Sequence, residues 1–372
     1  MLKLRNKVIL IISPERWGNL YVSKHHYALA LAKKGNKVFF LNPPRLFKSV
    51  SIDIQDVEKN LMIIDYRLII RGSNRLPMIL RKRFHKNLAN RIMQSINGSI
   101  DITWSFDPSS FQYMRAFGSQ INIFHPVDVH RSRFEKAIAN YADLILATSD
   151  RILERYKGFD KPKFKINHGI ADYFLSSKCN HNNFIKHPNR INVGYVGNLH
   201  YQYLDTAILE QIITHNPDVD FYFIGPYEKS NIGDKRFNST FIELLTNLTN
   251  THLVGEVASK DLPGYLREFN LFLMCYTGDR NIAEMANPHK ILEFLSTGRV
   301  VVSHYIDEYR NQDHIICMGR RNCDLPELFS DVINKLDYYN DKNKSKERIS
   351  LARNNTYDRQ LNRIESILEN NL

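Results

Sequence analysis

The stretch "NPHKILEFLSTGRVVVS" (287–303) combines a helix start, a short helix, a glycine stop and a buried strand. Asn287 is a favourable N-cap and Pro288 suits the first helical position, so we expect the helix to begin there. Lys290 then falls in the first turn, where the helix dipole disfavours a cation. Glu293 follows one turn later on the same face. An anionic ligand at the helix start would remove this conflict, whereas a surface Lys–Glu pair would explain the spacing alone.

Short apolar runs alternate with amphipathic segments along the rest of the chain. The first run, "KVILIIS" (7–13), is followed by a helical segment at 22–34 and by "KVFFLN" (37–42), which is the pattern of a strand–helix–strand unit. A polar segment at 176–189 has no periodicity and is expected to be a linker. A second strand–helix series starts at "INVGYVGN" (191–198). We therefore predict an α/β chain with two doubly wound parallel-sheet domains facing a cleft, 1–177 and 186–354.

Composition restricts the class of protein. The 372 residues are 43% hydrophobic, which is typical of a globular chain. No apolar run is long enough to span a bilayer, and no small-residue cleavage site follows the basic, apolar start. The four cysteines (Cys179, Cys275, Cys317 and Cys323) do not have the spacing of a zinc site. We expect a cytoplasmic protein with reduced thiols.

The positive charge is concentrated in the first half of the chain. Residues 1–175 hold 29 lysines and arginines against 14 acids, and the remainder holds 22 against 25, which gives the net charge of +12. Residues 67–91 carry eight of these cations and no acid, with apolar side chains between them. This stretch is either a solvated helix face or a surface that binds anionic lipid. Nucleic-acid binding would rest on charge alone, because no nucleic-acid-binding motif accompanies it.

The opening stretch resembles the donor-nucleotide motif of bacterial GT-B glycosyltransferases of the family 4, or group 1, type, roughly Pro-x-Lys-x-x-Glu-(aromatic)-x-(small)-x-Gly-x-x-Val-Val. Further stretches resemble other parts of that family in the same order, including "ERWGNLYVSKHHYALALAKKGNKVFFLNPP", "ADLILATSDRILERY", "INVGYVGNLHYQYLD" and "NNTYDRQLNRIESIL". Together they cover about 350 residues. The resemblance implies that a C-terminal helix at about 355–372 crosses back to the first domain.

The resemblance also implies a donor site in the second domain. Lys290 would bind the donor diphosphate and Glu293 the ribose hydroxyls. The expected donor site comprises Gly197, Asn198, Pro288, His289, Lys290 and Glu293. The sequence departs from the family pattern at two places. Many relatives have an Arg and a Lys just after the glycine that corresponds to Gly197, whereas Asn198, Leu199 and His200 follow it here. Retaining relatives have a glutamate at the position of Met285.

The first domain is expected to supply the acceptor site and a base. Trp17, Gly18 and Asn19 follow the first strand, although Trp17 is equally suited to packing. One of His25 and His26 is expected to touch substrate. Asp107 and Asp128 both follow apolar strands, where an aspartate either removes a proton or caps a turn. Asp128 is preferred as the base, because His125 and Arg131 lie three residues to either side.

These features predict an enzyme that transfers a sugar from a nucleotide-sugar to a lipid-linked or polysaccharide acceptor, on the inner face of the plasma membrane. We expect no cofactor and no metal, because the one Asp-x-Asp match, "DVD" (218–220), is better explained as a turn before a strand. A sugar-nucleotide 2-epimerase and a two-lobed sugar-binding protein remain alternatives. A Rossmann dehydrogenase is disfavoured, because no Gly-x-Gly-x-x-Gly follows the first strand.

Overall fold

The chain is divided into two compact units in a computed structural model. Unit 1 comprises Met1–Gly169 and Tyr357–Leu372, and unit 2 comprises Ile170–Thr356. The boundary lies at Gly169, eight residues before the end of the domain expected from the sequence. The structure describes residues 3–18, 20–45, 52–67, 76–129, 132–176, 184–228, 238–277 and 287–372.

Unit 1 is built on a sheet of eight strands in the order β3-β4-β2-β1-β5-β6-β7-β8. Seven of them pair in parallel, as the apolar runs predict. Their bounds are β1 Val8–Ile12, β2 Lys37–Leu41, β4 Leu61–Tyr66, β5 Ile102–Ser105, β6 Ile121–Phe124, β7 Leu144–Ala147 and β8 Lys163–Lys165. The edge strand β3 (Ile52–Glu58) is antiparallel to β4 and was not expected, because its sequence lacks a clear apolar alternation.

Helices cover both faces of this sheet, as in other parallel α/β sheets. One apolar cluster includes side chains from α1 (Ser23–Lys33), and another includes side chains from α2 (Met78–Ile96). The smaller elements are a 3-10 turn at Met114–Phe117 and the helices α3 (Glu135–Tyr141) and α4 (Asp150–Glu154).

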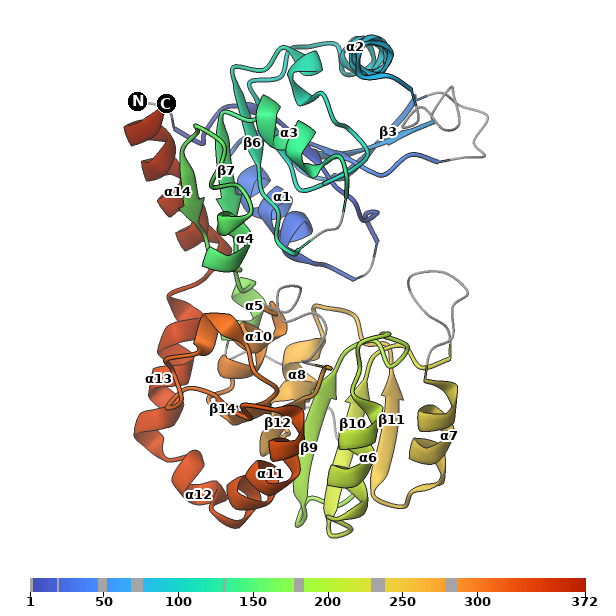
Figure 1. Ribbon diagram of the computed structural model, residues 1–372, viewed down its shortest axis with the longest axis vertical. Helices are drawn as coiled ribbons and strands as arrows, with labels where there is room; N and C mark the ends of the chain where they lie inside the picture. Colours follow the sequence, from blue (N-terminus) through green and yellow to red (C-terminus); the bar gives the residue numbers. More distant parts are fainter. Residues whose placement is uncertain are drawn as a thin grey trace. The chain divides into compact units, whose positions relative to one another are not determined.

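The C-terminal helix α14 (Tyr357–Asn371) belongs to unit 1, as the resemblance implies. It packs beside α1 (Figure 1), and its buried residues Tyr357, Leu361, Ile364 and Leu368 join the same apolar cluster as β1, β5, β6 and β7. The ring of Tyr357 lies directly on Gly169, where an added Cβ would approach ring carbons to 2.4 Å. A side chain at position 169 is therefore incompatible with the docked helix.

Unit 2 is built on a six-stranded, entirely parallel sheet in the order β11-β10-β9-β12-β13-β14. The strands are β9 Ile191–Val196, β10 Val219–Ile224, β11 Thr251–Gly255, β12 Leu271–Met274, β13 Val300–Ser303 and β14 Cys317–Met318. All residues of β10, β12 and β13 are buried. The sequence of β12 is apolar throughout, whereas β10 includes Asp220 and β13 ends at Ser303.

Of the helices that the structure describes in unit 2, four lie between strands in the chain, one precedes β9 and three follow β14 (Figure 1). Their bounds are α5 Asp172–Leu175, α6 Thr206–Thr214, α7 Ser239–Asn247, α8 Leu262–Leu266, α10 Lys290–Leu295, α11 Leu325–Asn334, α12 Leu336–Tyr339 and α13 Lys342–Arg353. Short 3-10 turns occur at Asp307–Tyr309 and Asn322–Asp324. No helix among the described residues is both long and apolar enough to cross a membrane.

The last amphipathic segment of the chain forms two helices. It is interrupted between Arg353, the end of α13, and Tyr357, the start of α14. Arg348 of α13 is 1% exposed and donates to the carbonyls of Ile315, Gly298 and Tyr339, which fixes α13 to unit 2. The interruption lets the chain leave unit 2 and return to unit 1.

The contact between Gly169 and Tyr357 gives a first prediction. Gly169→Ala should lower the free energy of unfolding by about 1–3 kcal/mol, because the added methyl group forces the Tyr357 ring away from its seat. Urea denaturation measures the change. Gly158→Ala is the matched control, since an added Cβ there meets no atom within 4 Å. Equal stability of the two variants would contradict the proposed seat.

Candidate active site

The expected donor residues lie at the carboxyl edge of the unit 2 sheet. In a parallel sheet the carboxyl ends of all strands meet at one edge, and the helix after each strand begins there. Gly197 directly follows β9, and α10 follows β12, the strand paired with β9. The loops after these two strands are joined, because the Thr277 N–H donates to the Tyr203 carbonyl at 2.8 Å. The topology therefore places the two expected parts of the donor site on the same edge.

The turn after β9 is shaped by close backbone contact with the end of β10. The Gly197 N–H donates to the Ile224 carbonyl at 2.9 Å, so it is used by the sheet and does not point to a ligand. Gly225 has a φ of +140°, and an added Cβ there would meet the Gly197 carbonyl oxygen at 2.0 Å. Gly197 therefore shapes the turn, and its own N–H is not a phosphate donor.

Side chains next to Gly197 hold the loop in place. The Asn198 side chain accepts from the His200 N–H at 2.8 Å, and His200 Nε2 lies 2.8 Å from the Tyr227 carbonyl. Asn238 donates to the carbonyls of Leu199 and Tyr201. Asn198 and His200, which replace the cations common in the family, thus have structural partners here.

A buried histidine supports the end of β12 and was not found from the sequence. His304, directly after β13, is fully buried, and its Nδ1 lies 3.3 Å from the Met274 carbonyl and 3.4 Å from the Tyr276 N–H. Burial lowers the pKa of His304 to about 4. The neutral ring fixes the strand end from which the chain continues toward residues 278–286, outside the described residues. Met285, where retaining relatives have a glutamate, lies within this range.

Helix α10 begins at Lys290, three residues after the expected N-cap. Its N-cap is His289, which has helical backbone angles, and the turn before it is closed by the bond from the Ile291 N–H to the Pro288 carbonyl. The expectation that Asn287 caps the helix is therefore wrong. Pro288 still lies at the start of the turn, where its fixed φ is tolerated.

Lys290 and Glu293 are the two residues of α10 that are not fully buried, whereas Ile291, Leu292, Phe294 and Leu295 are. Lys290 Nζ is 3.4 Å from Glu293 Oε2, and His289 Nε2 is 4.0 Å from Glu293 Oε1. His289, Lys290 and Glu293 thus form one polar group at the carboxyl edge of the sheet. The Lys–Glu contact is the surface pair considered above, but Glu293 is only 12% exposed.

Burial of Glu293 is unfavourable for its charge. Desolvation raises the pKa of its carboxyl group above the usual 4.5, and nearby Lys290 offsets only part of this effect. A carboxylate kept in a partly buried place without full compensation is typical of a functional site. It is suited to accept hydrogen bonds from two neighbouring hydroxyl groups.

In unit 1 the loop after β1 is anchored by a buried carboxylate. Asp65 at the end of β4 accepts from Arg16 at 2.6 Å, from Arg45 at 2.7 Å and from Asn42 at 3.0 Å. Trp17 is half-buried. Its backbone N–H donates to the Asn42 side chain, and its ring packs edge-on against Phe40. Packing, one of the two roles considered for Trp17, is therefore present.

Other expected acceptor residues next to this loop differ in their accessibility. Gly18 is exposed, and an added Cβ would meet no atom within 4 Å. His25 is buried, with Nδ1 accepting from Val22 and Nε2 bonded to the Arg16 carbonyl, and burial lowers its pKa to about 4. His26 stacks on Tyr357. His25 therefore holds the loop and has no nitrogen left for substrate, while Asn19 lies outside the described residues.

The two expected base residues are in opposite environments. Asp107 is 1% exposed, and its Oδ1 accepts from Ser109 and from the Ser110 N–H, so it closes a turn. Asp128 is exposed in the loop after β6. Its expected neighbour Arg131 lies outside the described residues. Of the two, Asp128 has the access that a base needs.

His125, expected from the sequence to be a polar neighbour of Asp128, is instead part of the core. His125, directly after β6, is fully buried, stacks on Phe106, and has no hydrogen-bond partner for either ring nitrogen within the described ranges. Burial, with His168 and Lys24 nearby, lowers its pKa to about 3. Lys24 is 3% exposed and forms an ion pair with Glu15. The sequence signal for this buried group was Lys24, because a lysine in the first turn of a helix is disfavoured by the helix dipole, as at Lys290.

Comparison with known proteins identifies the fold. No protein-family model matches the sequence, and no curated protein is significantly similar to it. Among solved structures, sucrose-phosphate synthase from Thermosynechococcus elongatus has a TM-score of 0.70 at 13% identity, over 98% of each chain. A UDP-forming alpha,alpha-trehalose-phosphate synthase from Burkholderia xenovorans has a TM-score of 0.70 at 12% identity, over 98% of this chain and 99% of that one. The chain has the GT-B fold.

A third GT-B structure is informative about ligands of that protein. Anabaena HepE, in complex with UDP and glucose, has a TM-score of 0.67 at 13% identity, over 97% of this chain and 99% of HepE. The α/β class and the two-sheet arrangement expected from the sequence are thus confirmed. The GT-B fold also accounts for the return of α14 to the first unit.

The raised pKa of Glu293 predicts a pH-dependent effect on stability. A folded-state pKa above the unfolded one means that wild-type stability falls as pH rises through that interval. Glu293→Gln removes this cost, so its Tm should exceed that of the wild type at pH 7, with the difference shrinking toward pH 4. Calorimetric scans at both pH values measure it. Glu327→Gln, at an exposed position of α11, is the control and should show no such pH-dependent gain.

Proposed function

We propose that the protein is a glycosyltransferase that uses a nucleoside-diphosphate sugar as donor. The observation that carries the proposal is the polar group of His289, Lys290 and Glu293, at the carboxyl edge of the second sheet of a GT-B fold. UDP is the first nucleotide to test, because HepE is in complex with UDP and the trehalose-phosphate synthase is UDP-forming.

The proposed reaction needs a positively charged group that stabilises the negative charge developing on the diphosphate as the sugar leaves. Lys290 Nζ would contact the phosphate oxygens, and its charge would stabilise the departing nucleoside diphosphate. Glu293 would accept bonds from the two ribose hydroxyls and so fix the nucleotide in place. The short helix α10, six residues long, leaves Lys290 as the main source of positive charge.

The acceptor hydroxyl must lose a proton as it attacks the sugar. We assign this step to Asp128, since its exposed carboxylate can reach a substrate and pass the proton to water. Asp107 is not assigned a role in proton transfer, because its carboxylate closes a turn. The expected products are a glycoside, a nucleoside diphosphate and one proton.

Nucleotide binding tests the assignment of Lys290. Lys290→Ala should weaken UDP binding by roughly 1.5–3 kcal/mol, the worth of a hydrogen bond to a charged group, with little change in Tm. Isothermal titration calorimetry measures the affinity. Lys335→Ala removes a 60% exposed lysine from the same unit and should bind UDP as the wild type does. Asp128→Asn should bind UDP normally but lose sugar transfer. Unchanged affinity in Lys290→Ala would refute the donor site.

For the acceptor we propose a lipid-linked or polysaccharide chain at the inner face of the plasma membrane. The first turn of α2 exposes three consecutive apolar side chains, Met78, Ile79 and Leu80, with Ile79 81% exposed. Arg83 and Lys86 on the next turn are exposed cations. Apolar groups next to cations are suited to the surface of an anionic bilayer, where each cation contributes about 1 kcal/mol.

Not every cation of this stretch is available to lipid. Arg81 donates to the Gln112 side chain and lies over the Phe134 ring, and Lys82 lies over Tyr113 and Tyr141. Arg81 and Lys82 therefore stabilise unit 1. Residues 68–75 lie outside the described residues, so the proposal rests on the start of α2.

Vesicle sedimentation tests the membrane proposal. The protein should pellet with anionic vesicles at low salt and be released at high salt, because charge attraction is screened over about 8 Å at physiological salt. The double variant Arg83→Ser/Lys86→Ser should pellet less, while UDP affinity stays unchanged. Lys342→Ser/Lys346→Ser removes the same charge from exposed positions of α13 and should pellet as the wild type does. If anionic vesicles are not bound, a soluble acceptor replaces the membrane proposal.

A further inference from the structure

Three potential metal ligands converge in unit 2 at the amino ends of two neighbouring strands. Asp220 is the second residue of β10, His252 is the second residue of β11, and His187 precedes β9. His187 Nδ1 is 2.7 Å from Asp220 Oδ2, and His252 Nε2 is 3.6 Å from Asp220 Oδ1. One ligand atom from each residue lies within 4.8 Å of the other two. The cluster is at the opposite ends of the strands from Gly197.

The fold alone does not explain the burial of this cluster. Asp220 is fully buried and His252 is 7% exposed. Neither ring nitrogen of His252 has a hydrogen-bond partner within the described part of the chain, since the carboxylate oxygen at 3.6 Å is beyond hydrogen-bond distance. An unsatisfied buried polar group costs about 1–3 kcal/mol. A ligand for His252 would remove that cost.

The donor set selects the kind of ion. Two imidazoles and one carboxylate are characteristic of Zn²⁺ sites that keep a fourth position for water. Ligand atoms at about 2.0–2.2 Å around a tetrahedral ion lie roughly 3.4 Å from each other. His187 Nδ1 and Asp220 Oδ2 are closer than this value at 2.7 Å, and the 49% exposed side chain of His187 can move to widen the gap. Mg²⁺ and Ca²⁺ prefer oxygen ligands and fit this set poorly.

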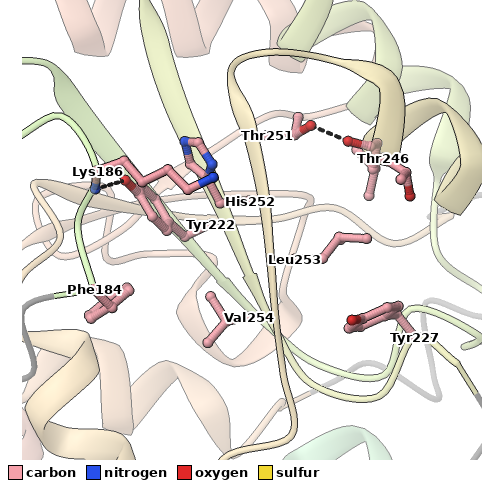
Figure 2. A pocket seen from close by; sticks show the side chains of 10 residues that line it. Phe184, Lys186, Tyr222, Tyr227, Thr246, Thr251, His252, Leu253 and Val254 are labelled. Carbon is pink, nitrogen blue, oxygen red and sulfur yellow. Dashed lines mark hydrogen bonds between the residues drawn. The ribbon is translucent and has the colours of Figure 1, made fainter.

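Two cations near the cluster compete with a metal ion. Arg190 Nη1 lies 3.3 Å from Asp220 Oδ1, and the same guanidinium donates through Nε to the Asp218 carbonyl. This contact leaves Oδ2 for an ion. Lys186 acts electrostatically on His252. Figure 2 shows Lys186 and His252 at a cavity of about 420 Å³, lined also by Phe184 and Tyr222. The cavity gives His252 a route to solvent.

We propose that His187, Asp220 and His252 bind a Zn²⁺ ion that clamps the segment before β9 to β10 and β11. His187 would bind through Nδ1. The proton that Nδ1 shares with Asp220 would move to Nε2, so the neutral ring would keep its one proton. Asp220 would bind through Oδ2, and water would fill the fourth position. The ion is far along the strands from Lys290, so its role is structural, and this proposal stands independently of the glycosyltransferase activity.

Zinc titration of the untagged, EDTA-treated full chain tests the proposal. Calorimetry with ZnCl₂ should show one site in the wild type and affinity at least about tenfold weaker in His187→Gln and in His252→Gln. His215→Gln, which removes an exposed histidine after α6, should bind as the wild type does. MgCl₂ should give no binding. Absence of a stoichiometric site in the wild type, or equal affinity in all three variants, would overturn the proposal.

A second variant separates metal binding from ordinary charge pairing. Arg190→Gln removes the competing cation, so Zn²⁺ should bind more tightly than to the wild type, and added ZnCl₂ should raise the Tm of this variant more. If the cluster only pairs Asp220 with positive side chains, Arg190→Gln would lower the Tm and ZnCl₂ would not restore it. That result would also overturn the proposal.

Discussion

Strand direction is the constraint on which the position of every candidate site residue depends. All strands of the unit 2 sheet are parallel, and β3 is the only antiparallel strand found in the described part of unit 1. The loops after β1, β5 and β6 therefore reach one edge of their sheet, and the loops after β9 and β12 reach one edge of theirs. Residues far apart in the sequence, such as Gly197 and Lys290, share an edge because the backbone ladders leave no other arrangement.

The candidate donor group shows how function opposes stability within this arrangement. Ile291, Leu292 and Leu295 fix α10 in the core, and the same packing partly buries Glu293. The fold would be better served by a neutral side chain there, because desolvation raises the pKa of the carboxyl group. A carboxylate that costs stability is most easily explained by a ligand that uses it.

The sequence was most informative where the signal is local. A buried parallel strand such as β12 is a continuous apolar run and could be predicted. The contiguous donor motif indicated the GT-B fold, while the roles of its residues stay a prediction. The start of α10 was misplaced, because Asn287 is a good cap only if the backbone turns at that residue. The roles of His125 and His304 could not be predicted, since each depends on rings or carbonyls from distant segments. The role of His25 depends on how the loop that carries Arg16 folds back on α1. The His187–Asp220–His252 cluster spans strands and has no sequence spacing of its own. Even Asp220, noticed within "DVD", was assigned to a turn and is in β10.

The return of α14 to unit 1 has a consequence for biosynthesis. Unit 2 is one continuous segment, so it can fold as soon as residues 170–356 have emerged from the ribosome. Unit 1 cannot fold fully before then, because Tyr357, Leu361, Ile364 and Leu368 complete its apolar cluster and are translated after unit 2. Until α14 has emerged, the nascent chain therefore carries a unit 1 whose sheet is made but whose apolar cluster is incomplete. The half of the protein that is made first is the half that finishes folding last.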